Sequence, residues 1–222
     1  MLDDARKQTD QLFELVRPEF LYERPIAERH RIVFYIGHLE AFDWNLLRPH
    51  MRETSRFDER LDRLFAFGID PVDGGLPKDV PSDWPPMDEV LRYRRTVREA
   101  LGDAKHDPEL MHTAIEHRLM HAETLAYMFH QLPLEQKVTR PAGSQIPSDP
   151  LRLESIQIPA GRATLGQPRN GTFGWDNEFD EHTVDVPAFA IDRYKVSNAQ
   201  YREFVEAGGY NDRRLWDDDA WR

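Results

Sequence analysis

Two histidines within one apolar helix face constrain this chain more than any other feature of its sequence. From residue 110 to residue 132, apolar side chains and the two histidines recur at steps of three or four residues. On an α-helix this spacing places all of them on one face. The stripe consists of Leu110, Ala114, His117, His121, Leu125, Met128 and Leu132. The sequence therefore predicts a helix whose buried face carries two imidazole rings one turn apart.

A buried imidazole needs a partner, because burying an unpaired polar group costs about 1–3 kcal/mol. One metal ion would serve both His117 and His121. The alternative is a pair of core histidines that form hydrogen bonds to a neighbouring helix, since two histidines at this spacing also arise by chance. A third histidine on another helix would favour the metal site.

Three further helices are predicted before this one, at residues 4–20, 28–51 and 87–101. They show apolar residues at the 3.6-residue period of an α-helix. His38 lies on or beside the buried stripe of the second helix, so it is the natural third imidazole. Four helices joined through one long connection form a helix bundle, in which metal sites are built from inward side chains of facing helices. The candidate metal ligands are therefore His38, His117 and His121.

The long connection between the second and third helices has two parts. Its first part carries a short helical pattern, made by Leu61, Leu64, Phe65 and Phe67, and its second part, GIDPVDGGLPKDVPSDWPP, has the composition of a loop. A loop of this length inside a compact domain is usually functional. Two outcomes are open at this point: a flap across a site, or an ordered wrap over the surface.

The composition excludes several classes of function. A net charge of −11 argues against nucleic acid as the main partner. The chain has no cysteine, so any metal site must use His, Asp or Glu. The N-terminus lacks the apolar core of a signal peptide, and no apolar run approaches the length of a membrane span. We therefore expect a cytoplasmic protein that binds neither membrane nor nucleic acid.

The character of the sequence changes at Pro133. Residues 133–150 show no periodicity and are predicted to form a linker after a bundle at residues 1–132. Short strands are expected at residues 154–158, 162–165, 184–186 and 189–192, the second as a partner of the first. A helix with the capping-box residues Ser197 and Gln200 follows. The predicted fold class is α+β, and we expect the second domain, residues 151–222, to be incomplete because so few elements cannot bury a core.

Two groups of motifs bring a known family into view. YIGHLEAFDW around His38 and HRLMHAE at residues 117–123 resemble the metal motif of DinB-like bundles, in the form found in sulfoxide synthases of ergothioneine biosynthesis. IPAGRATLG, WDNEFDEHTV, FAIDRYKVSNAQYREFVEAGGY and LWDDDAW resemble the opening of the formylglycine-generating-enzyme-like domain that follows the bundle in the same enzymes. The order of the two modules carries the resemblance across nearly the whole chain.

This resemblance implies that His38, His117 and His121 bind a non-heme Fe(II). It also implies an oxidoreductase that uses O2 to join a thiol sulfur to the imidazole ring of a trimethylated histidine, giving a sulfoxide. The spacing alone leaves iron, copper, nickel and zinc open, since neutral imidazoles suit all four metals. In the family much of the substrate pocket comes from the later part of the second domain. The candidates from the present half are Asp176, Asn177 and Glu178.

Two departures from the family pattern concern the substrates. Met120 stands where relatives often carry a glutamine that can touch the substrate, and residues 64–91 contain no arginine to hold the carboxylates of the thiol substrate, Lys78 being the only cation. Arginine is not freely replaced by lysine in bidentate recognition. The substrate pair can therefore differ from that of ergothioneine synthesis, with selenoneine- or ovothiol-type synthases as sister activities.

The remaining candidate residues receive weaker interpretations. Glu123 lies about 200° around the helix from His121, so we interpret it as a packing or outer contact or as a solvated side chain. The other histidines are expected at the surface. They are His30, His50, His106, His112, His130 and His182.

Two other classes of function stay open. One is a DinB-like thiol S-transferase or hydrolase, in which the bundle acts alone with zinc or nickel. The other is a truncated, non-catalytic relative that binds metal or merely folds. If the synthase interpretation holds, we expect a chain of these 222 residues to keep an intact bundle but to be inactive as a synthase, because the second domain has only its first elements.

Overall fold

The chain forms two compact units, residues 1–142 and 143–222. The computed structural model describes residues 1–51, 58–69, 75–102, 107–138 and 154–221. Among these, the first unit is built from helices, and the strands all belong to the second unit. This arrangement confirms the predicted α+β fold class.

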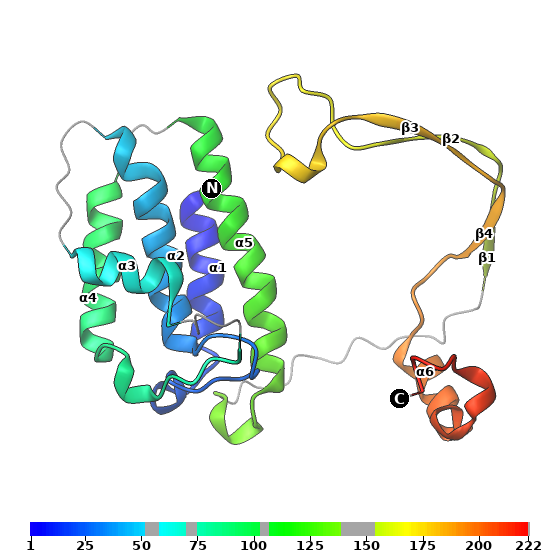
Figure 1. Ribbon diagram of the computed structural model, residues 1–222, viewed down its shortest axis with the longest axis horizontal. Coiled ribbons are helices and arrows are strands. Elements are labelled where there is room, and N and C mark those ends of the chain that lie inside the picture. Colours follow the sequence, from blue (N-terminus) through cyan, green and yellow to red (C-terminus); the bar gives the residue numbers. More distant parts are fainter. Residues whose placement is uncertain (52–57, 70–74, 103–106, 139–153, 222) are drawn as a thin grey trace. The chain divides into compact units, whose positions relative to one another are not determined.

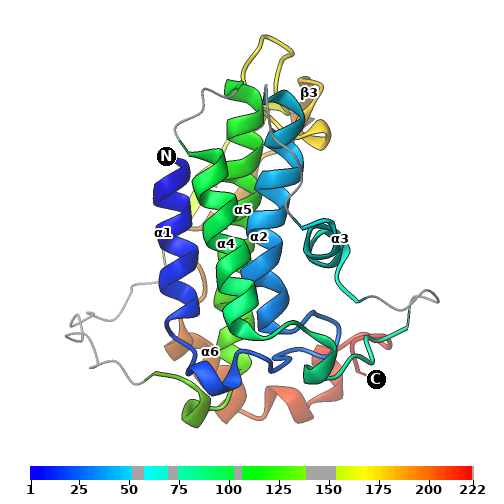
Figure 2. The same ribbon diagram turned by 90° about the vertical axis from the view of Figure 1, so that its left-hand side faces the viewer.

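Four long helices of the first unit lie side by side as a bundle (Figures 1 and 2). Helices α2 and α4 run in one direction, and α1 and α5 run in the other. Helix α2 packs against α4 and α5, and α1 packs against α5. The bounds of the four helices are Leu2–Phe13 for α1, Ile32–Leu47 for α2, Met87–Leu101 for α4 and Pro108–Gln131 for α5.

The core of the bundle centres on α2, which buries side chains on most of its surface. Trp44, Leu47 and Phe65 are fully buried there. The predicted stripe of α5 is confirmed: Leu110 and His121 are half-buried, and the other members are buried. The helix begins after the N-cap Asp107, whose carboxylate accepts a hydrogen bond of 2.8 Å from the Glu109 backbone.

The predicted bounds of two helices were wrong. Helix α1 ends at Phe13 rather than at residue 20, because Arg17 adopts the extended conformation favoured before Pro18. Helix α2 spans Ile32–Leu47 rather than residues 28–51, and a short 3₁₀ turn that contains Pro49 follows it. A proline lacks the N–H that would continue the α-helical ladder.

The crossover between α2 and α4 contains a fifth helix, α3, at Glu59–Phe67. It confirms the short helical piece expected there, and Asp58 caps its first turn by accepting a 2.9 Å hydrogen bond from the Leu61 backbone. Figure 1 shows α3 crossing α2 at a steep angle. This crossing brings the last turn of α3 against the middle of α2.

The described end of the crossover, residues 75–86, is held by one buried carboxylate. Asp79 accepts hydrogen bonds from Arg31 Nε at 2.8 Å and from Trp84 Nε1 at 2.7 Å, and it also pairs with Arg24. The Tyr22 hydroxyl donates to the Pro85 carbonyl at 2.8 Å. These contacts make residues 75–86 an ordered wrap on the loop before α2, which is the second of the two predicted outcomes.

Residues 134–138, at the start of the predicted linker, belong to the first unit. The Val138 amide donates to the Leu15 carbonyl at 2.8 Å, and the Arg17 amide donates to the Gln136 carbonyl at 3.0 Å. The Arg17 side chain adds a 3.2 Å hydrogen bond from Nε to the Lys137 carbonyl. Residues 139–150 of the predicted linker lie outside the described residues.

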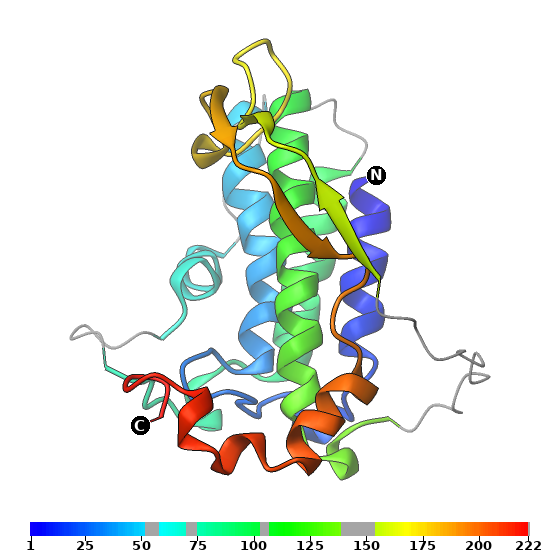
Figure 3. The same cartoon turned by 90° about the vertical axis from the view of Figure 1, so that its right-hand side faces the viewer.

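The second unit contains an antiparallel ribbon and one longer helix (Figure 3). The strands are β1 at Ser155–Ile158, β2 at Gly161–Leu165, β3 at His182–Val186 and β4 at Phe189–Asp192. The predicted pairing was wrong: β1 pairs with β4, opposing Ser155 to Asp192, and β2 pairs with β3, opposing Gly161 to Val186. Helix α6, Asn198–Glu206, has the predicted capping box between Ser197 and Gln200.

Burial differs sharply between the two units. Among the described residues 154–221, Gly209 is the only one that is buried, whereas the bundle buries a continuous apolar core. Large side chains such as Phe189, Ile191 and Tyr194 stay exposed in the second unit. None of the described helices combines the length and the apolar character that a membrane span requires.

Candidate metal centre

Helices α2 and α5 bring the three predicted histidines together. His38 lies in the middle of α2, and His117 and His121 lie on successive turns of the facing helix α5. Each residue offers one ring nitrogen, and these three atoms lie within 4.8 Å of one another. The described part of the chain holds no other group of three potential ligands of this kind. The structure thus realises the juxtaposition on which the metal hypothesis depends.

A backbone carbonyl sets the orientation of His38. Its Nδ1 lies 2.7 Å from the carbonyl oxygen of Phe65, in the last turn of α3. A carbonyl oxygen only accepts, so Nδ1 must carry the proton and donate. The lone pair of the neutral ring is then on Nε2, which is the arrangement that a metal-binding imidazole needs.

Aromatic rings hold two of the imidazoles in place. Phe34 stacks on His38 with ring centroids 4.7 Å apart, and Phe42 stacks on His117 with centroids 3.4 Å apart and planes at 8°. Phe34, His38 and Phe42 are spaced four residues apart on α2, so they lie on one face of that helix. The stacking restricts rotation of the imidazole rings and keeps water from their faces.

The electrostatic environment keeps the three imidazoles neutral. Burial is the main cause that lowers the pKa of His38, of His117 to about 2 and of His121 to about 4. The neighbouring histidines and the Arg118 guanidinium lower the pKa values of His117 and His121 further. Neutral imidazole is the form that binds metal ions, so the site needs no proton release at neutral pH.

The hydrogen bonding of the other two histidines fits a metal better than a packed core. Nδ1 of His117 and Nδ1 of His121 are buried and have no hydrogen-bond partner among the described residues. Core histidines bonded to a neighbouring helix would have used these atoms. Three neutral imidazoles with ring nitrogens this close, and no carboxylate or thiolate among them, suit a divalent transition metal.

A buried ion-pair cluster lies beside the histidines, and the sequence analysis missed it. Arg118, directly after His117, is fully buried and donates to Asp43 at 2.6 Å and to the Leu39 carbonyl at 2.9 Å. Arg118 and Arg98 both contact Glu40, at 3.3 and 2.7 Å. The only signal in the sequence was the charged residues at inward positions of two apolar helices.

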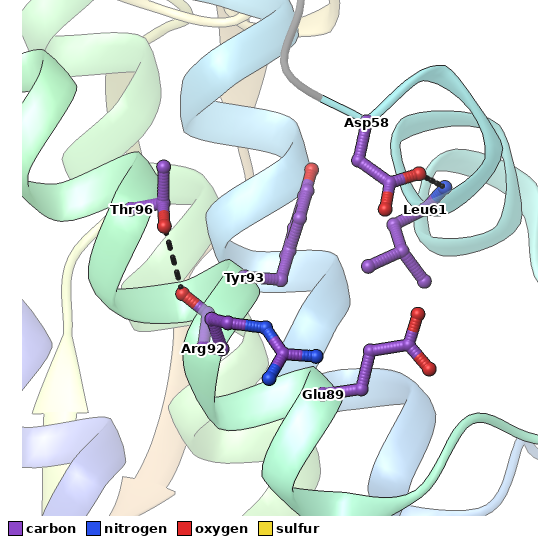
Figure 4. A pocket seen from close by; sticks show the side chains of 6 residues that line it. All are labelled: Asp58, Leu61, Glu89, Arg92, Tyr93 and Thr96. Carbon is purple, nitrogen blue, oxygen red and sulfur yellow. Dashed lines mark hydrogen bonds between the residues drawn. The ribbon is translucent and has the colours of Figure 1, made fainter.

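The open groove between α3 and α4 is not the site. It encloses about 210 Å³ and is lined by Asp58, Leu61, Glu89, Arg92, Tyr93 and Thr96 (Figure 4). Three of its polar groups serve the fold: Asp58 caps α3, the Tyr93 hydroxyl donates to Asp62 at 2.8 Å, and the Thr96 hydroxyl donates to the Arg92 carbonyl at 3.1 Å. No three potential metal ligands converge there among the described residues.

The structure places most of the weaker candidates in solvent. Glu123 is exposed, in agreement with the solvated interpretation, and Met120 and Lys78 are exposed as well. Asp176, Asn177 and Glu178 form an exposed 3₁₀ turn, in which Glu178 accepts a 2.7 Å hydrogen bond from the Trp175 backbone. No contact described for these three residues favours a catalytic role over the shaping of this loop.

One of the remaining histidines departs from the prediction. His30 is half-buried rather than exposed, and its ring centroid lies 4.1 Å from the ring centroid of Phe34. The described surface histidines are exposed as predicted, namely His50, His112, His130 and His182. His106 lies outside the described residues.

Comparison with protein families matches both units. The model of the DinB superfamily matches residues 1–131, and that of the sulfatase-modifying factor enzyme 1-like domain matches residues 144–222. The first of these matches covers more than half of the chain, and together they follow the order of the helical and the strand-bearing units.

Individual relatives extend this similarity. The chain is 31% identical to ergothioneine biosynthesis protein 1 of Neurospora crassa over 225 residues, which cover 86% of the chain and 25% of that relative. It is 32% identical to hercynine oxygenase of Mycolicibacterium smegmatis over 147 residues, 61% of the chain and 33% of the relative. A formylglycine-generating enzyme of Mycobacterium tuberculosis is 42% identical over 57 residues, 26% of the chain and 18% of that protein. The chain therefore spans about a third or less of the length of these relatives.

Proposed function

This chain belongs to the DinB superfamily and to the family of ergothioneine-biosynthesis proteins, and on that premise we propose that it contributes the metal site of an Fe(II)- and O2-dependent sulfoxide synthase. The proposed reaction joins a thiol sulfur to the imidazole ring of a histidine derivative. The observation that carries the proposal is the convergence of His38, His117 and His121 within 4.8 Å at the α2–α5 interface.

The three histidines would hold the iron as neutral ligands. Their depressed pKa values favour the uncharged form, so protons compete little with the metal at neutral pH. Iron(II) held in this way would supply the O2 and one-electron chemistry that amino acid side chains lack. Three protein ligands leave further coordination positions for small molecules.

The protein residues around the ligands orient and shield them. The Phe65 carbonyl fixes the tautomer of His38, and the rings of Phe34 and Phe42 cover two imidazole faces. Large apolar side chains exclude water and so limit side reactions of activated oxygen.

The substrate pair is proposed from the relatives. The names ergothioneine biosynthesis protein 1 and hercynine oxygenase support a histidine-derived acceptor of the hercynine type, a trimethylated histidine. The proposed donor is a thiol. Met120 departs from the family pattern at a position that can touch the substrate, and Lys78 replaces the arginines that hold the carboxylates of the thiol, so selenoneine- or ovothiol-type synthesis stays open as a sister activity. The match over residues 144–222 favours this function over a thiol S-transferase or hydrolase built from the bundle alone.

The metal half of the proposal is tested on the 222-residue chain itself. After anaerobic loading with Fe(II) and removal of the excess, elemental analysis should find one iron per chain. His38→Ala, His117→Ala and His121→Ala should each lose it, while the exposed His112→Ala serves as a matched control that keeps it. Iron that stays bound to all three site variants would contradict the proposal.

The synthase half of the proposal is tested on the whole polypeptide that is encoded by the gene for this chain. With Fe(II), O2, a thiol and a trimethylated histidine, mass spectrometry should detect the sulfoxide, and electrode measurements should show matching O2 uptake. Both signals should disappear in His121→Ala. Thiol transfer or hydrolysis without O2 uptake would instead support the S-transferase or hydrolase alternative.

A further inference from the structure

A glycine directly before the ligand His38 calls for an explanation. Gly37 lies in the interior of α2, where glycine is less favourable than alanine because it loses more backbone freedom on folding. A Cβ atom added to Gly37 would lie 2.3–2.4 Å from three ring carbons of Phe65. No side chain larger than hydrogen fits there unless Phe65 moves. Gly37 therefore lets the ring of Phe65 rest directly on the backbone of α2.

Phe65 contacts the next residue through its backbone. Its carbonyl oxygen lies 2.7 Å from Nδ1 of His38, while its ring is fully buried near Tyr93 and Trp84. Phe65 is also one of the last residues of α3, which ends at Phe67. The last four carbonyls of a helix have no partner within it, so this carbonyl is available to accept from the imidazole. Phe65 of α3 thus contacts two consecutive residues of α2, Gly37 through its ring and His38 through its carbonyl.

We propose that Gly37 and Phe65 are positioning residues of the metal centre: the close approach at Gly37 seats Phe65 so that its carbonyl fixes the tautomer and the direction of His38. The inference rests on the proposed function, because it assigns these residues to the same site. Neither residue is a ligand. Their role is to keep the lone pair of His38 on Nε2 and to fix the direction of the ring. The hydrogen bond from Nδ1, on the other edge of the ring, to the Phe65 carbonyl does both.

The same contact explains why α3 belongs to the site although it carries no ligand. His117 and His121 both project from α5, and their Nδ1 atoms have no hydrogen-bond partner among the described residues. Of the three histidines, only His38 forms a hydrogen bond within the described part of the chain, and its acceptor is a backbone carbonyl of the crossover helix α3. Displacing α3 should therefore affect His38 and leave the two ligands on α5 in place.

The test compares Gly37→Ala, Phe65→Leu and the double variant in the full 222-residue chain. Cobalt(II) is the probe, and its visible absorption reports both the dissociation constant and the ligand geometry. The added methyl group of Gly37→Ala should push Phe65 away and weaken Co(II) binding by about 10–100-fold, the usual effect of losing a partner of a metal-bound histidine. The double variant should recover most of the affinity, because a leucine can yield to the methyl group.

A second measurement on the metal-free chain reports the hydrogen bond itself. Proton–nitrogen correlation spectra of histidine-labelled protein should show His38 protonated at Nδ1 in the wild type and in the double variant that combines Gly37→Ala with Phe65→Leu. The Gly37→Ala single variant should lose this signature. Leu47→Ala is the matched control, since it removes a fully buried side chain of the same helix about 15 Å from Gly37, at 1.5 Å per residue. It should lower the melting temperature without changing the Co(II) affinity or the tautomer.

The outcomes separate the two proposals. A wild-type chain that binds no Co(II) would defeat the proposed function, and the tautomer spectra would still decide the role of Gly37 and Phe65. Unchanged affinity and an unchanged His38 signal in Gly37→Ala would overturn the inference. An equal loss of affinity in Leu47→Ala would also overturn it, because the effect would then follow from general stability.

Discussion

Helices α2 and α5 carry two buried polar clusters side by side, and the two are built on opposite principles. The ion-pair cluster, centred on Glu40, Asp43 and Arg118, joins opposite charges, with Arg118 2.6 Å from Asp43. The histidine cluster, His38, His117 and His121, gathers three groups of one kind whose ring nitrogens come within 4.8 Å of one another. No described carboxylate completes it as a metal-ligand group. Each charged group of the ion-pair cluster has an opposite charge within the protein, although Asp43 Oδ1 and Arg118 Nε have no hydrogen-bond partner among the described residues. On the metal proposal, the histidine cluster takes its partner from outside the protein.

On the metal proposal, this difference separates ion pairs that hold the helices together from a binding site on the same helix pair. Burying charges is costly, and once they are paired the removal of one partner leaves the other unpaired in a medium of low dielectric. Neutral imidazoles carry a smaller penalty, so a bundle with a well-packed core can hold them before a metal arrives. We therefore expect the ion pairs to determine stability and the histidines to determine binding.

The largest effect is expected from breaking the ion-pair cluster. Arg118→Met keeps much of the side-chain volume but leaves Glu40 and Asp43 buried without their central cation. The free energy of unfolding should fall by about 3–5 kcal/mol, as measured by urea denaturation of the metal-free chain. Arg118→Lys, which keeps the charge, should lose less. Equal stability of Arg118→Met and the wild type would show that the two clusters do not differ in this way.

The next largest effect is expected from adding a metal ion to the histidine cluster. Fe(II) or Co(II) at 100 times the dissociation constant should raise the free energy of unfolding by about 2.7 kcal/mol, because it binds only the folded state. A chelator should reverse this gain, and the helical circular dichroism should stay unchanged. Loss of helical signal in the metal-free wild type would mean that the metal is required for folding.

Acid should act on the histidine cluster of the metal-free chain. The folded-state pKa values of His117, about 2, and His121, about 4, lie below the ordinary value of 6.5, so the unfolded chain binds more protons below pH 6.5. Stability should be constant above that pH and fall as the pH decreases from 6.5 toward 4, by up to about 1.4 kcal/mol per pH unit for each such histidine. Thermal unfolding at several pH values measures this slope. His117→Gln should reduce it, and a slope that His117→Gln leaves unchanged would assign the acid effect to other groups.

The smallest effect on folding is expected from removing a ligand. His121→Ala should abolish Co(II) binding, yet change the free energy of unfolding of the metal-free chain by less than about 1 kcal/mol. The lost packing of a half-buried ring is offset by removal of a buried nitrogen that has no described partner. Urea denaturation and Co(II) titration of the same sample check both halves. A loss as large as that of Arg118→Met would remove the distinction between the clusters.

Local patterns in the sequence were sufficient for the elements that carry the ligands. The stripe from Leu110 to Leu132 placed His117 and His121 on one buried face, and the structure buries that face. The capping box of Ser197 and Gln200 and the bounds of the four strands were likewise found near their predicted positions. The resemblance to the ergothioneine family, based on motifs in both units, is confirmed by the family matches.

What failed depends on residues far apart in the chain. After helix α1 ends ahead of Pro18, residues 15–17 bond to residues 136–138, and no pattern near residue 13 predicts those partners. β1 pairs with β4 rather than with β2 because β2 and β3, which lie between them in the sequence, pair with each other. Arg118 was overlooked because its partners Glu40 and Asp43 lie on another helix.

The sequence by itself determined which helix faces are buried and that three histidines are candidates for one site, because periodicity and capping act over a few residues. Only the tertiary structure decided that the histidines meet, that the Phe65 carbonyl orients His38, and that a guanidinium can be buried beside them. These outcomes depend on how α2, α3 and α5 cross, and the crossing is set by the packing of many side chains distant in sequence. Such packing leaves no local signature at the residues that it brings together.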